Sequence, residues 1–96
     1  MLILHVSTRA DWEAAEVTGS YTGNTLATEG FIHCAKPEQL MHVLTRYFPR
    51  LVDHVLVEID SDKVAAELKW EGKSDLFPHI YGPLNLTAVT RTKAIW

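Results

Sequence analysis

The sequence predicts an α+β fold in a single domain, residues 1–96, with a curved, mostly antiparallel sheet and two main helices. Short β-rich apolar runs recur along the chain, but their spacing does not repeat a regular βαβ pattern. Two other segments carry apolar residues at helical spacing. With 96 residues, of which 47% are hydrophobic, the chain can bury one core and is too short for a second.

The first third of the chain indicates a strand, a helix and a loop. Residues 2–7 are apolar and β-rich, which predicts a strand. Ser7 or Thr8 can cap the helix that follows, and Gly19 marks its end. Residues 20–29 mix Ser, Thr, Gly and Asn, the composition of a loop that exposes its side chains.

The middle of the chain indicates strand, helix and strand. Residues 31–34 form a short apolar run, and Pro37 then occupies a position that a first helical turn tolerates. Apolar residues at helical spacing over 40–48 predict the second main helix, which Pro49 ends. Residues 54–59 alternate cleanly between two faces, which is typical of a strand.

The last third indicates a helical turn and the remaining strands. We expect a short helical turn over 60–68, because Asp60 or Ser61 can cap it, and a polar loop up to Leu76. Residues 77–81 and 84–94 then predict the last strands, separated by Gly82 and Pro83.

Charge and composition exclude several function classes. The net charge is −3 and Lys and Arg are scattered, so the basic stripe of a nucleic-acid-binding protein is missing. No run approaches the roughly 18 apolar residues of a membrane span, and the N-terminus lacks a leader pattern. Cys34 is the single cysteine, which suits a reducing compartment. We therefore expect a cytoplasmic protein without nucleic-acid or membrane partners; its oligomeric state is open.

Three predicted strands each present one histidine among apolar neighbours, namely His5, His33 and His79. Strand alternation places His5 on one face with Ile3 and Ser7, and each of the other two lies beside an aromatic residue two positions away. The three imidazoles could converge on one cleft. The alternative is that each ring is a core or rim residue bonded to a backbone carbonyl.

A zinc site is the first function to consider for three histidines, since neutral imidazole is a common metal ligand. None of the pairs has the spacing of a local chelate, and no cysteine or carboxylate completes a metal motif, so we expect no metal. Strand alternation turns Cys34 away from His33, which predicts a buried structural thiol rather than a nucleophile.

Carboxylates near these runs are Glu29, Glu58 and Glu71. Glu29 and Glu71 each precede a glycine at the end of a predicted element, from where a side chain can reach the mouth of a cleft. Glu58 is the weaker candidate because it lies in the middle of a strand. Tyr81 precedes Gly82, and could line a pocket where the glycine lets a ligand approach the backbone.

These residues carry a family resemblance. The segments Ile-Leu-His-Val-Ser, Gly-Phe-Ile-His-Cys, Val-Glu-Ile-Asp, Lys-Trp-Glu and Phe-Pro-His-Ile-Tyr-Gly-Pro-Leu occur in an order that resembles the small bacterial proteins of domain-of-unknown-function family 952. The similarity covers essentially the whole chain. Two departures stand out, since Leu4 stands where the family often has Tyr, and Ala35 where it often has Ser.

The family pattern is in turn similar to ADP-ribosyltransferase-like folds, which bind NAD in a cleft. This resemblance implies that His5 hydrogen bonds a ribose hydroxyl and that His33 or Tyr81 packs on the nicotinamide or its ribose. It implies that Glu71 is the carboxylate facing the positive charge that develops on the ribose. The candidate catalytic residues are therefore His5, His33 and Glu71. The candidate residues for binding NAD are His5, Ser7, His33, His79 and Tyr81.

Three functions remain as hypotheses. The first is an NAD-binding, ADP-ribosyltransferase-like enzyme, with NAD as its substrate, that acts on an unknown acceptor. The second is a noncatalytic module that binds a nucleotide or small metabolite in the same cleft. The third is a metal-dependent hydrolase that uses His5, His33 and His79.

Overall fold

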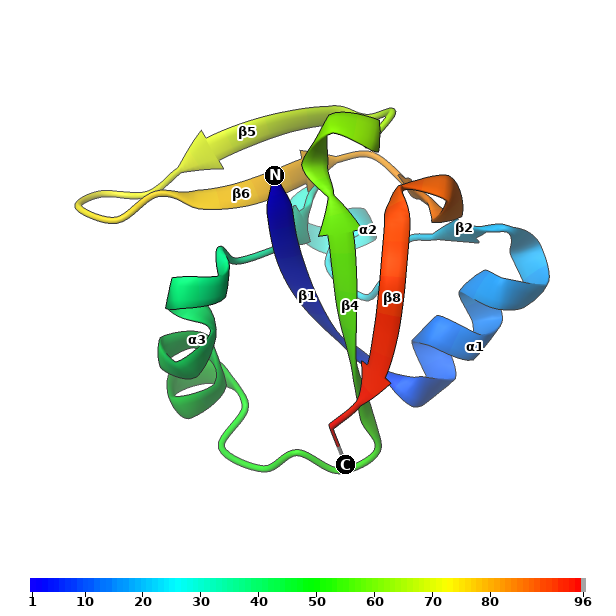
Figure 1. Ribbon diagram of the computed structural model, residues 1–96, viewed down its shortest axis with the longest axis horizontal. Coiled ribbons are helices and arrows are strands. Elements are labelled where there is room, and N and C mark those ends of the chain that lie inside the picture. Colours follow the sequence, from blue (N-terminus) through cyan, green and yellow to red (C-terminus); the bar gives the residue numbers. More distant parts are fainter. Residues whose placement is uncertain (96) are drawn as a thin grey trace.

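The computed structural model describes residues 1–95. They form a central antiparallel sheet of three strands, with the other elements around it (Figure 1). The strand order is β1-β4-β8, so β1 lies at one edge. The bounds of these strands are Leu2–Thr8 for β1, His54–Asp60 for β4 and Val89–Ala94 for β8. The α+β class and the antiparallel pairing agree with the prediction.

The remaining strands of the described part of the chain form two smaller antiparallel sheets, so the single curved sheet that the sequence predicts is divided into three. One has the order β3-β6-β5, with bounds Ile32–His33, Phe77–Tyr81 and Glu67–Glu71. The other pairs β2, Ser20–Tyr21, with β7, Leu84–Asn85. An antiparallel bridge between Leu4 and Ala35 joins the edge of β1 to the chain beyond β3.

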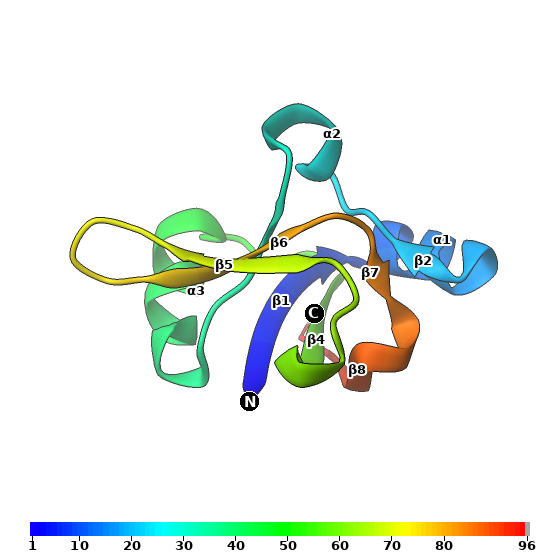
Figure 2. The ribbon, with the colours of Figure 1, turned by 90° about the horizontal axis from the view of Figure 1, so that it is seen from above.

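Two main helices flank the central sheet, α1 over Arg9–Thr18 and α3 over Leu40–Tyr47 (Figures 1 and 2). Thr8 caps α1, as predicted, because the Asp11 N–H donates to its Oγ1 at 3.1 Å. A third helix, α2 over Leu26–Glu29, is short and projects from the body (Figure 2). Within residues 1–95, three 3₁₀ turns complete the elements, at Pro37–Gln39, Ser61–Lys63 and Leu86–Ala88.

Three local predictions are wrong. The strand expected over 84–94 is interrupted by the 3₁₀ turn at Leu86–Ala88, so β7 and β8 are separate strands that pair with β2 and β4. The helical turn expected over 60–68 is confined to Ser61–Lys63, and β5 begins at Glu67 because its backbone pairs with β6. The expected exposed loop over 20–29 instead contains β2 and α2. Tyr21 within it is 2% exposed, since its ring packs against the core. Pairing and burial with distant segments override local composition in all three places.

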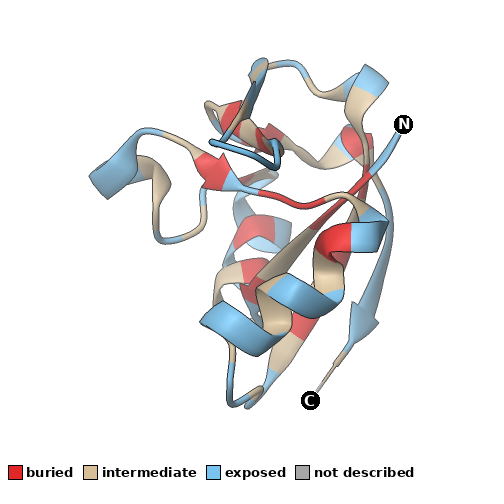
Figure 3. Cartoon of the chain, turned by 90° about the vertical axis from the view of Figure 1, so that its left-hand side faces the viewer, coloured by how far each residue is buried: buried red, intermediate tan, exposed pale blue. Residues whose placement is uncertain are grey.

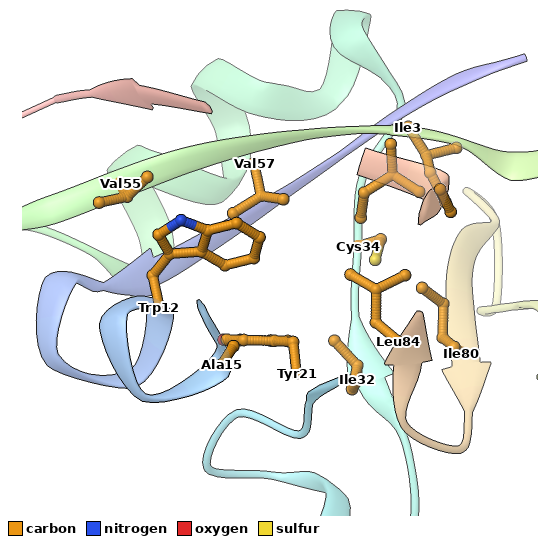
Figure 4. Close-up of a cluster of buried hydrophobic side chains, with 12 residues drawn as sticks. Ile3, Trp12, Ala15, Tyr21, Ile32, Cys34, Val55, Val57, Ile80 and Leu84 are labelled. Atoms are coloured by element: carbon orange, nitrogen blue, oxygen red, sulfur yellow. The ribbon is translucent and has the colours of Figure 1, made fainter. Parts of the chain in front are cut away.

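The core lies between α1 and one face of the central sheet and continues to the β3-β6-β5 sheet (Figure 4). Figure 3 marks the buried residues along the chain in red. Trp12 on α1 lies beside Val55 and Val57 of β4, and Ala15 lies beside Tyr21 (Figure 4). The predicted alternation of β4 is confirmed, because every second residue of the strand is buried. Among residues 1–95, no helix has both the length and the hydropathy to cross a membrane.

Candidate functional site

A cleft of about 560 Å³ follows the open edge of β1, and we call it the β1 cleft. The backbone of Leu4 exchanges both hydrogen bonds with Ala35, at 2.8 Å each, so its N–H and C=O point away from β4. The backbone N–H and C=O groups of every second residue of an antiparallel strand lie on the same edge. The N–H and C=O of Val6 therefore also face the open edge of β1. Within residues 1–95 no strand pairs with β1 there, which leaves the Val6 N–H and C=O facing the cleft.

The structure brings five of the six candidate site residues into the lining of this cleft, and these are His5, Ser7, His33, Glu71 and His79. Tyr81 is not part of the lining, but its hydroxyl donates to Glu71 Oε1 at 2.6 Å. The three strands that carry the histidines therefore do meet at one cleft, as the sequence suggested.

His5 is the most constrained of these side chains. Its Nδ1 lies 2.5 Å from the carbonyl oxygen of His33, and because a carbonyl only accepts, Nδ1 carries the proton. Its Nε2 lies 2.6 Å from the Tyr21 hydroxyl, which donates to it. Burial lowers the pKa of His5 to about 4. The ring is therefore neutral at pH 7 and fixed in one tautomer.

Tyr21 is a cleft residue that the sequence did not reveal. It lies in a segment whose composition indicates a loop, yet burial raises the pKa of its hydroxyl to about 12. Its ring meets that of His5 edge-on, with centroids 5.1 Å apart, and also packs against Trp12. Tyr21 thus connects the hydrophobic core to the imidazole in the cleft. A lone aromatic residue among turn formers was the available signal.

A second cluster lies on the β5-β6 hairpin. Glu71 Oε1 accepts from Tyr81 and also from His79 Nδ1, the latter at 2.9 Å. The hydrogen bond from the Tyr81 hydroxyl holds the pKa of Glu71 below its usual range, and the hydrogen bond from His79 adds a smaller effect in the same direction. The hydrogen bond between Tyr81 and Glu71 also raises the pKa of Tyr81. Glu71 is therefore a charged carboxylate at neutral pH, with one oxygen anchored by its neighbours.

His33 and Phe31 link the two clusters. His33 on β3 is the register partner of His79 on β6, and their ring centroids are 5.2 Å apart. The Phe31 ring stacks on His79 at 4.2 Å, which makes it a further aromatic residue beside the site. His33 Nε2 donates to Glu29 Oε1 at 3.1 Å. The sequence pointed to Phe31 only as the neighbour of His33 on one strand face.

Comparison with known proteins gives the chain a family. The model of the family described as "Protein of unknown function (DUF952)" matches residues 6–92. The chain belongs to the DUF952 family. None of the curated proteins compared with it matches.

The DUF952 chain is also similar to solved structures of protein CC0527 from Caulobacter crescentus. The X-ray structure is 31% identical, with a TM-score of 0.89 over 98% of this chain and 85% of that one. The solution NMR structure is 33% identical, with a TM-score of 0.80 over 96% and 82% of the two chains. The family resemblance inferred from sequence is thereby confirmed.

The two departures from the family pattern are partners in space. Leu4 and Ala35 form the bridge that joins β1 to the chain after β3, and both are buried. The bridge uses backbone atoms alone, so it does not depend on the side chains at these two positions. The bridge also fixes where the open edge of β1 begins.

Gln39 is a buried polar residue that sequence reasoning missed. Its Oε1 accepts from the Lys36 N–H and its Nε2 donates to the Leu76 carbonyl oxygen, both at 2.9 Å. These bonds tie the start of α3 to the tip of the β5-β6 hairpin, which carries Glu71. Pro37, noted in the sequence only as a helix start, leads directly into this connection.

The geometry does not favour the three-histidine hydrolase. Both ring nitrogens of His5 already have partners in the protein, so metal binding would have to break a hydrogen bond. Across residues 1–95, no group of three or more His, Cys, Asp or Glu side chains is arranged to hold a metal ion. Cys34 is buried, as expected, and burial raises the pKa of its thiol, which makes it a poor nucleophile.

Proposed function

We propose that the β1 cleft binds the nicotinamide-ribose half of NAD, and that the chain is an ADP-ribosyltransferase-like enzyme acting on a separate acceptor. The observation that carries this proposal is the open backbone of Val6 next to the neutral ring of His5. The cleft volume of about 560 Å³ also lies in the range usual for small-molecule sites.

The Val6 backbone offers one N–H donor and one C=O acceptor toward the same side of β1. A primary carboxamide, the substituent of the nicotinamide ring, carries the complementary pair of one acceptor and a donor. Two parallel hydrogen bonds to Val6 would fix the orientation of the nicotinamide. A peptide that adds to the edge of a sheet is oriented by the same kind of backbone hydrogen bonds. This contact selects an amide over a carboxylate, since a carboxylate brings no donor for the Val6 carbonyl.

Glu71 supplies the negative charge that the reaction needs. As the bond between the ribose C1′ and the nicotinamide nitrogen breaks, its electron pair stays on the nicotinamide and positive charge develops on the ribose. A carboxylate held in place by Tyr81 and His79 stabilises that charge without reorganising. The lowered pKa of Glu71 keeps it ionised at neutral pH, which suits an electrostatic role better than that of a general base.

His5 has a more specific role here than the resemblance implied. Its Nε2 already accepts from Tyr21, so a ribose hydroxyl reaches this nitrogen only by replacing the Tyr21 hydroxyl. We assign to the His5-Tyr21 pair a positioning role at the ribose. Ser7 lies on the same strand face as His5, although its Oγ donates to the Thr8 carbonyl oxygen.

The binding step is tested by NMR with nicotinamide, and with nicotinic acid as the matched ligand that carries a carboxylate. We expect millimolar nicotinamide to shift the amide resonances of His5 and Val6. Titration of the same resonances with nicotinic acid should give a Kd at least about tenfold higher. If nicotinamide leaves both resonances unmoved, or if nicotinic acid binds as well as nicotinamide, the proposed site is wrong.

The chemical step is tested by following nicotinamide release during prolonged incubation with NAD. We expect Glu71→Gln to lower the release rate by about 100-fold, because it removes the charge that faces the ribose. Glu67→Gln is the matched control on the same strand, since Glu67 is exposed and does not line the cleft. Equal rates in the parent and Glu71→Gln would contradict the catalytic assignment.

A noncatalytic binding module is the second candidate, and one observation favours it. The lining of the cleft, drawn from residues 1–95, contains no Lys or Arg that could pair with a diphosphate. A protein that binds a small metabolite without phosphates needs no such pair. In that case nicotinamide would bind, NAD would not be cleaved, and Glu71→Gln would bind nicotinamide as well as the parent does.

A further inference from the structure

The β1 cleft has a second side, formed by the strand face opposite to His5. Leu4 and Val6 point to this face, and so does His54, because it pairs in register with Thr8. The ring of Phe48, just after α3, packs edge-on against His54 with centroids 5.7 Å apart. We call this side the α3 compartment, lined by Leu4, Val6, Leu40, Val43, Phe48 and His54.

Helix α3 does not close this compartment. Leu40, Val43 and Tyr47 follow each other at intervals of three and four residues and share one helix face, which lines the cleft. An amphipathic helix normally buries such a face, as α1 does with Trp12 and Ala15. None of the residues of α3 is buried. Space for an apolar group therefore remains between α3 and β1.

The compartment is one side of the β1 cleft, and the charges that line the cleft as a whole favour some ligands over others. The cleft lining carries three carboxylates, Asp11, Glu29 and Glu71, and among the described residues it carries no Lys or Arg. An anionic group would be repelled by these carboxylates and would find no cation to pair with. An apolar molecule with a basic amine would bury its carbon skeleton against α3 and be attracted by the carboxylates.

We propose that the α3 compartment holds the carbon skeleton of the acceptor, and that this acceptor is a small apolar amine. The inference rests on the proposed function, because the Val6 edge lies between the two sides of the cleft and would hold the nicotinamide end of NAD. In the transfer, the bound ammonium first gives one proton to water. The neutral amine nitrogen then bonds to the ribose C1′ and the bond from C1′ to the nicotinamide nitrogen breaks. The electron pair of the broken bond stays on the nicotinamide, and the new secondary ammonium gives a second proton to water.

The test uses benzylamine and benzoate, which share a ring and differ in charge. In titrations followed by NMR, benzylamine should shift the amide resonances of Val43 and Phe48. The Kd of benzoate should be at least about tenfold higher than that of benzylamine. Val43→Trp should fill the compartment and raise the Kd of benzylamine at least about tenfold. Met41→Trp is the control and should leave this Kd unchanged, since Met41 is 72% exposed on α3. Should Val43→Trp fail to fold, Val43→Phe serves instead.

The outcomes separate this inference from the proposed function. If nicotinamide shifts Val6 but benzylamine shifts neither Val43 nor Phe48, the acceptor assignment is wrong and the nicotinamide site stands. If benzylamine binds and nicotinamide does not, the α3 compartment is a site for an apolar amine but not for an acceptor, and the acceptor assignment is again overturned. Equal binding of benzoate and benzylamine, or of benzylamine to Val43→Trp and the parent, also overturns it.

Discussion

Protonation of His5 should destabilise the protein as the pH falls, and the structure gives the sign and the size. The unfolded chain binds a proton at this ring with a pKa near 6.5, whereas burial lowers the folded value to about 4. Between these values the unfolded state binds more protons, so stability decreases as the pH falls from 6.5 toward 4. Above 6.5 both states are neutral at His5 and its contribution is constant.

The magnitude follows from the pH interval of 2.5 between 6.5 and 4. Each pH unit corresponds to about 1.4 kcal/mol, which gives about 3 kcal/mol as an upper value. The ring is partly accessible to solvent, and this reduces the expected effect to about 2 kcal/mol. The Tyr21 hydrogen bond acts in the same sense, because a proton on Nε2 would face the hydroxyl that now donates to it. The hydrogen bond to the His33 carbonyl acts in the opposite sense, since it raises the pKa of His5, but burial outweighs it.

The assay is urea unfolding at pH 4 and pH 7 for the parent and for His5→Asn, whose side-chain amide can still donate to the His33 carbonyl. We expect the parent to lose about 2 kcal/mol more than His5→Asn between the two pH values. Carboxylates that titrate in this range act equally in both proteins. His42→Asn is the control, because His42 is exposed on α3 and should leave the pH dependence of the parent unchanged. Identical pH dependence in His5→Asn and the parent would refute the reasoning.

Three further substitutions test the scaffold of the site, each by urea unfolding. Tyr21→Phe leaves the His5 acceptor without its donor and should cost about 1–3 kcal/mol; no change would argue against the hydrogen bond. Gln39→Leu leaves two backbone groups unpaired and should cost about 1–3 kcal/mol, whereas a stabilised protein would contradict its linking role. Gly72→Ala should cost at least about 1 kcal/mol, because the new Cβ would lie 2.1 Å from the Asp75 carbonyl oxygen; a neutral effect would show that the hairpin tip relaxes freely.

The parts of the fold that follow from local sequence were predicted well. The alternation over 54–59 specified β4 and its buried face, and Thr8 with Gly19 specified both ends of α1. Where a segment depends on a distant partner, local reasoning failed. β5 is stabilised by pairing with β6, and Tyr21 is buried by contacts with His5 and Trp12.

The candidate site shows the same division. The sequence indicated the imidazoles and Glu71 because polar groups stand out in apolar runs and beside glycine. It did not indicate Gln39, since a single glutamine before a helix has no local signature of burial. The open edge at Val6 was equally hidden, because it depends on where Ala35 ends its pairing with β1.

The sequence by itself determined the α+β class, the two helices, the family and the residues that could form a site. Their joining into one cleft was decided by the tertiary structure, through the Leu4-Ala35 bridge and the register that sets His33 opposite His79. It also decided the chemical state of His5 and Glu71. Burial and hydrogen-bond partners set a pKa, and those partners come from residues 28 positions away for His5 and 8 and 10 positions away for Glu71.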